Sequence, residues 1–483
     1  MRISSIIPCV RNANGSGHEQ RRQTDGPGKD EVNRMNDFRK TAQEMLEFIR
    51  ISPTCFHAVA NIGRMLEAAG FQQLQEKEEW KLEKGGRYYT ERNDSSVIAF
   101  VIPEKEVGIR GFHMAAAHSD SPCFKIKEKP ELTVEEHYLR LNTEKYGGMI
   151  LSTWLDRPLS VAGRLAVKNG NGIEGRLVNI DRDLCVIPNV AIHMNREMNK
   201  GVEYNPQVDL LPLLADVTFD AHDAQTASEN AEEQPEKVEK PTLTLAALAA
   251  EAAGVDAETI LGEDLFLYTR QEGKMIGAKG EFVLSPRLDD LQSAFALTKA
   301  FTESTPAEYI NLCAVFDNEE VGSGTRQGAD STFLEDTLQR ITEGLQEGHS
   351  TYLRWVADSF LISADNAHAV HPNHPEKADP ANRPYLNGGI VIKYHGSQKY
   401  TTDGISAAKM KDYCERAKVP YQTYANRSDI AGGSTLGNIS TAHVSVSSVD
   451  IGLPQLAMHS AVETAGMKDT EYAVRALKEF WGE

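Results

Sequence analysis

The spacing of hydrophobic residues predicts helices alternating with strands in the first and last parts of the chain. After Met35, apolar residues recur at the period of an amphipathic helix, at Phe38, Met45, Leu46 and Ile49. Residues 58–69 repeat this pattern, and mainly apolar runs at residues 310–316 and before His118 are typical of buried strands. Because such patterns resume at "LSPRLDDLQSAFALTKAF" and continue to the C-terminus, we expect an α/β domain.

The pattern changes between residues 123 and 270. Short strand-like segments at residues 163–170, 172–180 and 187–194 are separated by Gly and Asn turns. We therefore expect a β-rich domain that interrupts the α/β domain, whose two parts are residues 35–122 and 271–483. Within the insertion, residues 220–241 are acidic and poor in apolar side chains, which predicts a solvated loop.

Residues 1–34 are polar and Gly-rich, and they show no hydrophobic periodicity beyond a short apolar patch. A segment of this kind cannot bury a core, so we expect it to be disordered. One arginine and a brief apolar run make a poor signal peptide. An upstream start codon or a dispensable tail is the preferred interpretation, and a targeting role is the alternative.

Composition narrows the classes of function. The 483 residues are 40% hydrophobic and 25% charged, as in a globular protein, and the formal net charge is −19. This charge disfavours binding to nucleic acid, whose phosphates need a basic face, and to an anionic membrane. No apolar stretch is long enough to span a bilayer. The six cysteines are scattered without a CxxC pair, which favours reduced thiols and a cytoplasmic location.

Several apolar runs end in side chains that commonly bind metals. The run at residues 310–316 leads into Glu319 and Glu320, and two adjacent carboxylates at the mouth of a buried strand are costly without a positive partner. The same pattern recurs at His118 and Asp120, at Asp289, at Asp365 and at His459. Because ligands bind at the carboxyl ends of strands in open α/β sheets, we expect these residues to converge on one crevice.

Each of these motifs also has a simpler explanation. A lone HxD is commonly a turn, an acidic pair before a helix is commonly an N-terminal cap, and the histidines of "DNAHAVHPNHP" could belong to a surface loop. Taken together these explanations weaken, because several strand ends would each bury a charge without a partner.

Six short motifs lie in order along the chain from about Met35 to the C-terminus: "AAAHSDSP", "SPRLDDL", "FDNEEVGS", "ISADNAHAVHPN", "VIKYHGSQKY" and "DIGLPQLAMHS". Together they resemble the motifs of the aspartyl aminopeptidase family of dinuclear zinc exopeptidases. The resemblance implies a zinc-exopeptidase-like α/β/α catalytic domain with a mixed central sheet. It also implies that the β-rich insertion, residues 123–270, is a dimerisation domain.

The resemblance implies two Zn²⁺ ions per subunit, for which Co²⁺ or Mn²⁺ could substitute. The implied metal ligands are His118, Asp289, Glu320, Asp365 and His459. Asp289 would bridge the two metals, with His118 at one of them and His459 at the other. Asp290 would support the ligands without binding a metal, and Asp120 would orient the imidazole of His118.

The resemblance also gives the adjacent carboxylates Glu319 and Glu320 two separate functions. Glu320 would bind a metal, while Glu319 would act as the general base. The metals would lower the pKa of the attacking water, and Glu319 would pass its proton to the leaving amine. A ligand is poorly suited to that second role, because its lone pairs are engaged with the metal.

The implied substrates are short peptides with N-terminal Asp or Glu. Lys393 and Tyr400 match the substrate pocket of the family, although Lys393 could instead be an ordinary lysine at a strand end. A preference for neutral residues, or a related metal-dependent deacylase or carboxypeptidase, is the alternative in the same class. A non-catalytic assembly protein with a structural metal site is the alternative in another class. Glu319 argues against it, because a structural site needs no free base.

The resemblance further implies dimers that assemble into a tetrahedral dodecamer. His193, near the end of the strand-like segment 187–194, matches a histidine that crosses the dimer interface into the neighbouring active site. There it could stabilise the oxyanion of the reaction. The alternative is a histidine that serves only the interface.

Overall fold

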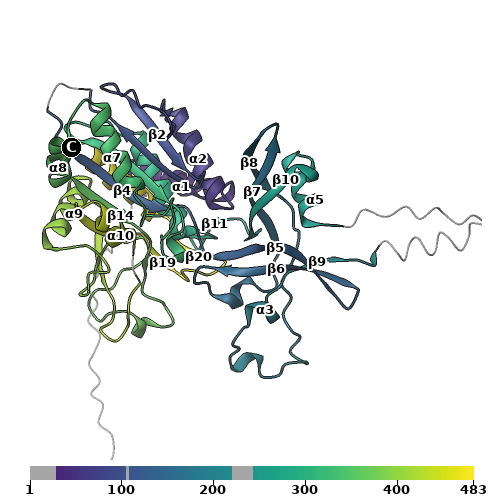
Figure 1. The fold of residues 1–483 in the computed structure, drawn as a ribbon. Coiled ribbons are helices and arrows are strands. Elements are labelled where there is room, and N and C mark those ends of the chain that lie inside the picture. The colour runs from purple at the N-terminus through teal and green to yellow at the C-terminus, as the bar shows by residue number, and fades with distance from the viewer. Residues whose placement is uncertain (1–28, 105–107, 220–242, 434) are drawn as a thin grey trace, which may run out of the picture.

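The computed structural model describes residues 29–104, 108–219, 243–433 and 435–483 (Figure 1). Helix α1 (Lys29–Arg50) begins before Met35, and the boundary at Met35 between an extension and the folded part stays a prediction. Met35 of this helix is partly buried against the hydrophobic core, and Phe38 is buried in it. The rest of the predicted N-terminal extension and the predicted acidic loop, residues 220–241, lie outside the described residues.

A mixed nine-stranded sheet lies at the centre of the α/β part, in the order β1-β2-β3-β13-β4-β14-β18-β16-β17. Strands β13, β4 and β14 are neighbours and run parallel, while β3 and β16 pair antiparallel with their neighbours β13 and β18. The strands are β1 (Gln72–Gln73), β2 (Arg87–Arg92), β3 (Ser96–Val101), β4 (Phe112–His118), β13 (Ile310–Phe316), β14 (Phe360–Ala364), β16 (Ile390–Tyr394), β17 (Tyr421–Ala425) and β18 (Ser447–Gly452).

Helices cover both faces of this sheet (Figure 1). Successive strand residues point to opposite faces, so Ala115 and Ala117 of β4 join one hydrophobic core while Met114 and Ala116 join the other. The first core includes α1, α2 (Cys55–Ala68), α6 (Leu288–Thr302), α9 (Gly404–Arg416) and α11 (Asp469–Trp481). The second includes α7 (Phe333–Gly344), α8 (His349–Ala357) and α10 (Leu436–His443). The predicted α/β/α layers with a mixed sheet are therefore confirmed.

A second sheet has six antiparallel strands in the order β8-β7-β10-β5-β6-β9, and all of them lie within residues 123–269. It projects to one side of the α/β part and has its own core around Phe124, Leu165 and Leu265 (Figure 1). Its elements are β5 (Cys123–Val134), β6 (Tyr138–Tyr146), β7 (Leu159–Asn169), β8 (Gly172–Asn179), β9 (Leu213–Asp216) and β10 (Ile260–Thr269), with the helices α3 (Pro206–Asp209) and α5 (Leu245–Ala253).

The strand predicted at residues 187–194 does not form. This segment is a loop with a turn at Ile192–Met194, and its apolar residues Val190, Ile192 and Met194 are exposed. The prediction was wrong because apolar residues were taken to mark a strand packed inside one chain. Here the same residues lie on the surface, where they gain no burial from a sheet.

A third, five-stranded sheet lies beside the nine-stranded one, in the order β11-β12-β20-β19-β15. Its strands are β11 (Lys274–Ile276), β12 (Phe282–Ser285), β15 (Ala367–His368), β19 (Pro454–Leu456) and β20 (Glu463–Gly466). Because β12 pairs with β20, this sheet brings the start of α6 close to the loop between β19 and β20.

Among the described residues, no helix is both long enough and apolar enough to cross a membrane. The five cysteines in these ranges are free thiols, as their scattered spacing predicts.

Candidate metal centre and active site

Three neighbouring parallel strands bring the first predicted residues together. Phe316 of β13 is paired with His118 of β4, and β14 runs in register beside β4, so the carboxyl ends of all three lie at one edge. His118 ends β4, and Asp365 follows β14 directly. Glu319 and Glu320 lie in the short 3-10 turn after β13. The predicted convergence at strand ends is therefore correct for these residues.

Asp289 and His459 reach the same place by a different route, because they follow β12 and β19 of the five-stranded sheet and not strands of the nine-stranded sheet. Asp289 lies at the start of α6 with a non-helical backbone, and its peptide bond to Asp290 is cis. His459 lies in the loop between β19 and β20, with a φ of 65°. The small third sheet explains this route. Its paired strands β12 and β20 place the start of α6, with Asp289, close to the loop that carries His459.

Glu463, which the sequence analysis missed, holds these two residues together. It is the first residue of β20 and is buried. Its Oε2 accepts a hydrogen bond from the backbone N–H of Asp289 at 3.1 Å, and its Oε1 accepts one from the N–H of His459 at 2.7 Å. The only signal in the sequence is a carboxylate four residues after His459, which by itself predicts nothing.

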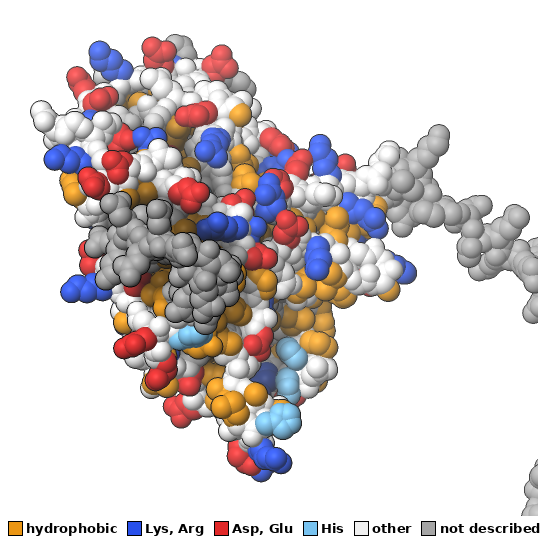
Figure 2. All heavy atoms as spheres, turned by 90° about the vertical axis from the view of Figure 1, so that its right-hand side faces the viewer, with side chains coloured by type: hydrophobic (Ala, Val, Ile, Leu, Met, Phe, Trp, Pro, Cys, Tyr) orange, Lys and Arg blue, Asp and Glu red, His pale blue; other side chains and the backbone are white. Residues whose placement is uncertain are grey.

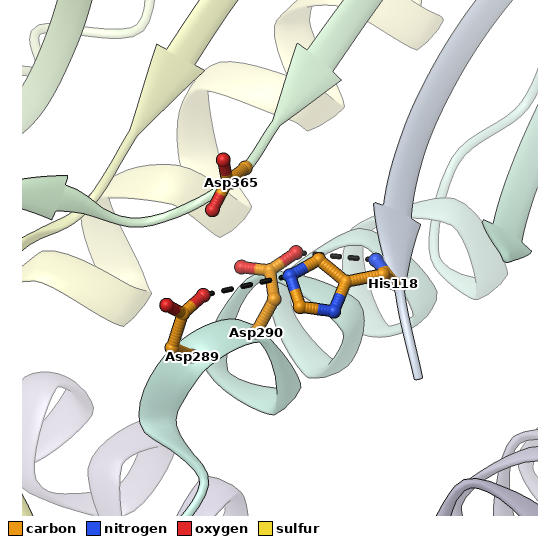
Figure 3. Close-up of side chains that lie close together, drawn as sticks. All are labelled: His118, Asp289, Asp290 and Asp365. Atoms are coloured by element: carbon orange, nitrogen blue, oxygen red, sulfur yellow. Dashed lines mark hydrogen bonds and ion pairs between the residues drawn. The ribbon is translucent and has the colours of Figure 1, made fainter. Parts of the chain in front are cut away.

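The Asp289 carboxylate lies between two imidazoles. Its Oδ1 is 3.5 Å from Nε2 of His118, and its Oδ2 is 3.4 Å from Nε2 of His459. The same nitrogen of His459 lies 3.4 Å from Oε2 of Glu320. Figure 3 shows the side chains of His118, Asp289, Asp290 and Asp365 directed toward a common space.

The ligand atoms form two groups that share Asp289. One contains His118, Asp289, Asp290 and Asp365, and the other contains Asp289, Glu320 and His459. Within each group the ligand atoms lie within 4.8 Å of one another. A third such group, of His118 with Glu319 and Glu320, places Glu319 beside both.

Three carboxylate oxygens in these groups are buried without a hydrogen-bond donor: Oδ1 of Asp289, Oδ1 of Asp290 and Oε1 of Glu320. A buried polar atom left unpaired costs about 1–3 kcal/mol, and a charged one costs more. Cations bound between the carboxylates would remove this cost. Imidazole and carboxylate donors suit Zn²⁺, so the residues present fit a zinc centre.

The negative charges of these buried carboxylates also favour a bound cation. Burial and the neighbouring carboxylates, opposed by His118, raise the pKa of Glu319 to about 7. Burial and Asp289 raise the pKa of Glu320 well above its usual range. The imidazoles outweigh burial at Asp289 and hold the pKa of that carboxyl below its usual range.

Asp120 positions the ligands without facing the space between them. Its carbonyl oxygen lies 3.1 Å from Nδ1 of His118, and its Oδ1 lies 3.3 Å from the same nitrogen. Its carboxylate also accepts hydrogen bonds from the backbone N–H groups of Glu319, at 3.1 Å, and Glu320, at 3.2 Å. These contacts match the expected support of His118 and extend it to both glutamates. Asp290 has a similar function, because its Oδ2 accepts from the N–H of His118 at 3.2 Å (Figure 3).

The predicted substrate residues Lys393 and Tyr400 are buried beside the cluster. Lys393 is only 3% exposed, and its Nζ lies 3.2 Å from Oδ2 of Asp365 and 5.4 Å from the ring centre of Tyr400. Burial opposes its charge, but the Asp365 carboxylate outweighs burial and raises the pKa of Lys393. Its ammonium therefore already has one partner, a predicted metal ligand.

His193 is not part of the cluster in a single chain. It is exposed in the loop of residues 187–194, and it belongs to none of the possible metal-binding groups found among the described residues.

Comparison with known proteins gives consistent results. The family described as aminopeptidase I zinc metalloprotease (M18) matches residues 48–481. A probable M18 family aminopeptidase 2 of Clostridium novyi is 48% identical over 446 residues, which cover 92% of this chain and 98% of that protein. A protein of the same description from Pseudomonas putida is 40% identical over 437 residues, covering 90% of this chain and 97% of its own.

Solved structures show the same fold. The structure described as the Ape4 and Nbr1 complex superposes with a TM-score of 0.85 at 36% identity, covering 92% of this chain and 86% of that chain. A structure described as the S. cerevesiae mApe1 dodecamer superposes with a TM-score of 0.76 at 26% identity, covering 92% of this chain and 97% of that chain.

Proposed function

The chain belongs to the aminopeptidase I (M18) family of zinc metalloproteases and is a metal-dependent aminopeptidase; from this premise we propose that it removes N-terminal residues, preferably Asp and Glu, from short peptides. One observation carries the proposal. The carboxylate of Asp289 presents one oxygen to the imidazole of His118 and the other to that of His459, as a residue that bridges two metals must do.

In this proposal the two groups hold two zinc ions. His118, Asp289 and Asp365 bind one, and Asp289, Glu320 and His459 bind the other. When bound, the zinc ions supply Lewis-acid polarisation of the scissile carbonyl and lower the pKa of water. Asp120 and Asp290 keep His118 oriented through the hydrogen bonds described above.

Glu319 is the proposed general base. It lies beside His118 and Glu320 but outside the two groups that share Asp289, so its carboxylate stays free to accept a proton. Burial raises its pKa to about 7 in the metal-free chain, and bound cations would lower that value. In the reaction Glu319 takes a proton from the attacking water and gives it to the leaving amine.

The proposed acidic preference depends on Lys393. Its Nζ touches Asp365, so a substrate bound at that carboxylate has this ammonium within reach. If a metal ion also bound Asp365, that carboxylate would neutralise less of the Lys393 charge. More of the charge would then attract an Asp or Glu side chain of the substrate. The ring of Tyr400 beside Nζ helps to hold the ammonium in place. If Lys393 serves only Asp365, the pocket lacks this selectivity and neutral residues become the alternative substrates.

The exposed loop of the insertion supports the proposed assembly. Figure 2 views the molecule from the side of the six-stranded sheet, and hydrophobic side chains gather on that face. The insertion exposes Val190, Ile192, Met194, Val202 and Val208. Because a second copy would cover such residues, and a relative of the same fold is described as a dodecamer, we propose dimers that assemble into a tetrahedral dodecamer. In a dimer His193 would reach the neighbouring active site and donate to the developing oxyanion.

The function is tested with the full chain loaded with zinc and three peptides of one sequence. One begins with Asp, one with Leu, and one with N-acetyl-Asp. We expect mass spectrometry to detect free Asp from the first, less free Leu from the second, and no product from the third. Release of acetate or of the C-terminal residue would instead indicate the deacylase or the carboxypeptidase.

The same assay tests the metal. A chelator should abolish release of Asp, and added Zn²⁺ should restore it, with Co²⁺ or Mn²⁺ as possible substitutes. Activity that survives complete removal of metal would contradict the proposal. A cytoplasmic location stays a prediction.

A further inference from the structure

We propose that residues 146–150, which begin at the last residue of β6, are a positioning segment by which the inserted sheet holds both halves of the metal centre. The inference rests on the proposed two-metal function. It adds that the insertion supports the centre within its own chain, apart from any part it plays in assembly.

The first contact is made by the phenol of Tyr146, the last residue of β6. Its hydroxyl lies 2.7 Å from Oδ2 of Asp120 and 2.8 Å from Nδ2 of Asn318. The Asn318 amide is oriented by two other donors, because its Oδ1 accepts from Thr325 at 2.7 Å and from Gln327 at 2.8 Å. Nδ2 is therefore the donor to Tyr146, and the phenol proton points to Asp120.

This contact completes the set of donors around Asp120. The same carboxylate lies beside Nδ1 of His118 and accepts the N–H groups of Glu319 and Glu320. Tyr146 thus acts on three residues of the site through one buried carboxylate. The ring of Tyr146 is anchored in the inserted sheet, where it packs edge-on against Phe266 of β10 with ring centres 5.6 Å apart.

The second contact is a close approach of backbone. Gly147 has a φ of 79°, and a Cβ added to it would lie 3.2 Å from Cβ of Glu320 and 3.4 Å from Cα of Pro122. A side chain here would push against Glu320, so only glycine lets the segment pass so near.

The third contact orients His459. The carbonyl oxygen of Gly148 lies 2.6 Å from Nδ1 of His459, and the N–H of Ile150 donates to the carbonyl oxygen of His459 at 2.9 Å. A carbonyl can only accept, so Nδ1 carries the proton. In the neutral imidazole Nε2 then carries the lone pair and faces Asp289 and Glu320, and this is the tautomer that a metal ligand needs.

These three contacts reach both groups of ligands from one short segment. Through Tyr146 it supports His118 and the backbone of the two glutamates, and through Gly148 and Ile150 it supports His459. Residues of this kind usually change metal affinity or turnover by about 10–100-fold when they are altered.

The first test is Tyr146→Phe in the full, zinc-loaded chain, which removes one hydroxyl and keeps the ring. We expect zinc to be lost to a competing chelator at about 10–100-fold lower chelator concentration, and kcat to fall while KM stays within twofold. The matched control is Tyr413→Phe, since the Tyr413 hydroxyl also donates to a carboxylate, Glu483, at 2.6 Å, but far from the site in sequence and outside the ligand groups. The control should retain zinc like the wild type.

The second test compares zinc retention in Gly147→Ala with zinc retention in Gly170→Ala. Both glycines have a positive φ, 79° and 58°, but a Cβ at Gly170 would meet nothing within 4 Å. Both substitutions therefore place an alanine at a positive φ, and only the first pushes on Glu320. We expect Gly147→Ala to lose one of its two zinc ions at a chelator concentration at which Gly170→Ala keeps both.

The possible outcomes separate this inference from the proposed function. If the wild type binds zinc but releases no N-terminal residue, the proposed function is contradicted. The zinc retention of the variants then still tests whether residues 146–150 position the metal ligands. If the wild type is active and both Tyr146→Phe and Gly147→Ala retain zinc and kcat like their controls, the segment has no positioning function. If Tyr146→Phe does not fold, the comparison of the two glycine variants decides.

Discussion

The metal cluster and the loop of residues 187–194 are opposite kinds of surface in one chain. In the cluster, His118, Asp120 and Asp289 are each at most 3% exposed, and hydrogen bonds within the same chain hold His118 and the backbone of Asp289 in place. In the loop, Met194 is 82% exposed, and Val190 and Ile192 also face solvent. One region buries negative charge among metal-type ligand atoms, and the other exposes apolar side chains.

The difference indicates what each region needs in order to be complete. The oxygens without donors in the cluster need a positive ion, and the rest of that site is already positioned within one chain. The loop needs another surface, because fully burying one Val or Met side chain stabilises a structure by about 1.5–3 kcal/mol. We therefore propose that each chain supplies all ligands of its own metals, and that His193 acts in the active site of a neighbouring chain.

The largest expected effect separates Glu319 from Glu320 inside the cluster. Glu319→Gln should lower kcat by about 10²–10⁴-fold and keep both metals, because it removes a base and not a ligand. Glu320→Gln should weaken the binding of one metal. Elemental analysis of the two purified variants makes the measurement, and the adjacent positions serve as controls for each other. Loss of zinc from Glu319→Gln with retention in Glu320→Gln would reverse the assignment.

His193→Ala tests the loop. We expect kcat to fall by about 10²–10³-fold, the range for one oxyanion donor, with both zinc ions and the assembly intact. Steady-state kinetics, zinc analysis and light scattering are measured on one sample. A variant that keeps full activity, or that loses activity only because it dissociates, would leave His193 as a residue of the interface alone.

Lys393→Met should have a smaller and more selective effect. If Lys393 binds the acidic side chain, kcat/KM for Asp and Glu peptides should fall by an amount that corresponds to about 1.5–3 kcal/mol of transition-state stabilisation. Activity on Leu or Ala peptides should fall much less. Because Lys393 also touches Asp365, zinc content is measured in parallel. An equal loss on every substrate, with loss of zinc, would show that Lys393 serves Asp365 only.

The smallest expected effect is on the stability of the metal-free protein. Burial and neighbouring carboxylates raise the pKa of Glu319 to about 7, and Asp289 and Glu320 overcome burial to raise that of His459 to about 10. Both groups thus bind protons more tightly when folded, so their contribution is present at low pH and lost as pH rises through these values. The melting temperature of the metal-free chain should fall between pH 5 and 9. A melting temperature that rises over this range would contradict the description of the cluster.

The sequence predicted the parts of the cluster that depend on mainly apolar runs. The runs before His118 and at residues 310–316 are strands with those ends, and their parallel pairing brings the ligands to one edge. Asp289 and His459 were predicted by motif and lie beside these ligands, but they follow strands of another sheet. Their position depends on Glu463 and on a small sheet whose strands are too short to give a pattern.

The loop was misread for a related reason. The apolar residues of the segment 187–194 are real, but the pattern does not say whether the covering surface belongs to the same chain. Lys393 shows the same limit for charge, because a lysine at a strand end gave no sign that Asp365, from a distant part of the sequence, would be its partner.

The most direct test of this division is to mix two inactive variants, Glu319→Gln and His193→Ala, and let their subunits reassemble. In a mixed dimer one site combines an intact Glu319 with the neighbour's intact His193, and the other site has neither. Random pairing of equal amounts makes half of the dimers mixed, so activity should recover to about a quarter of the wild type. No recovery, with exchange of subunits proven by differently tagged chains, would contradict the account.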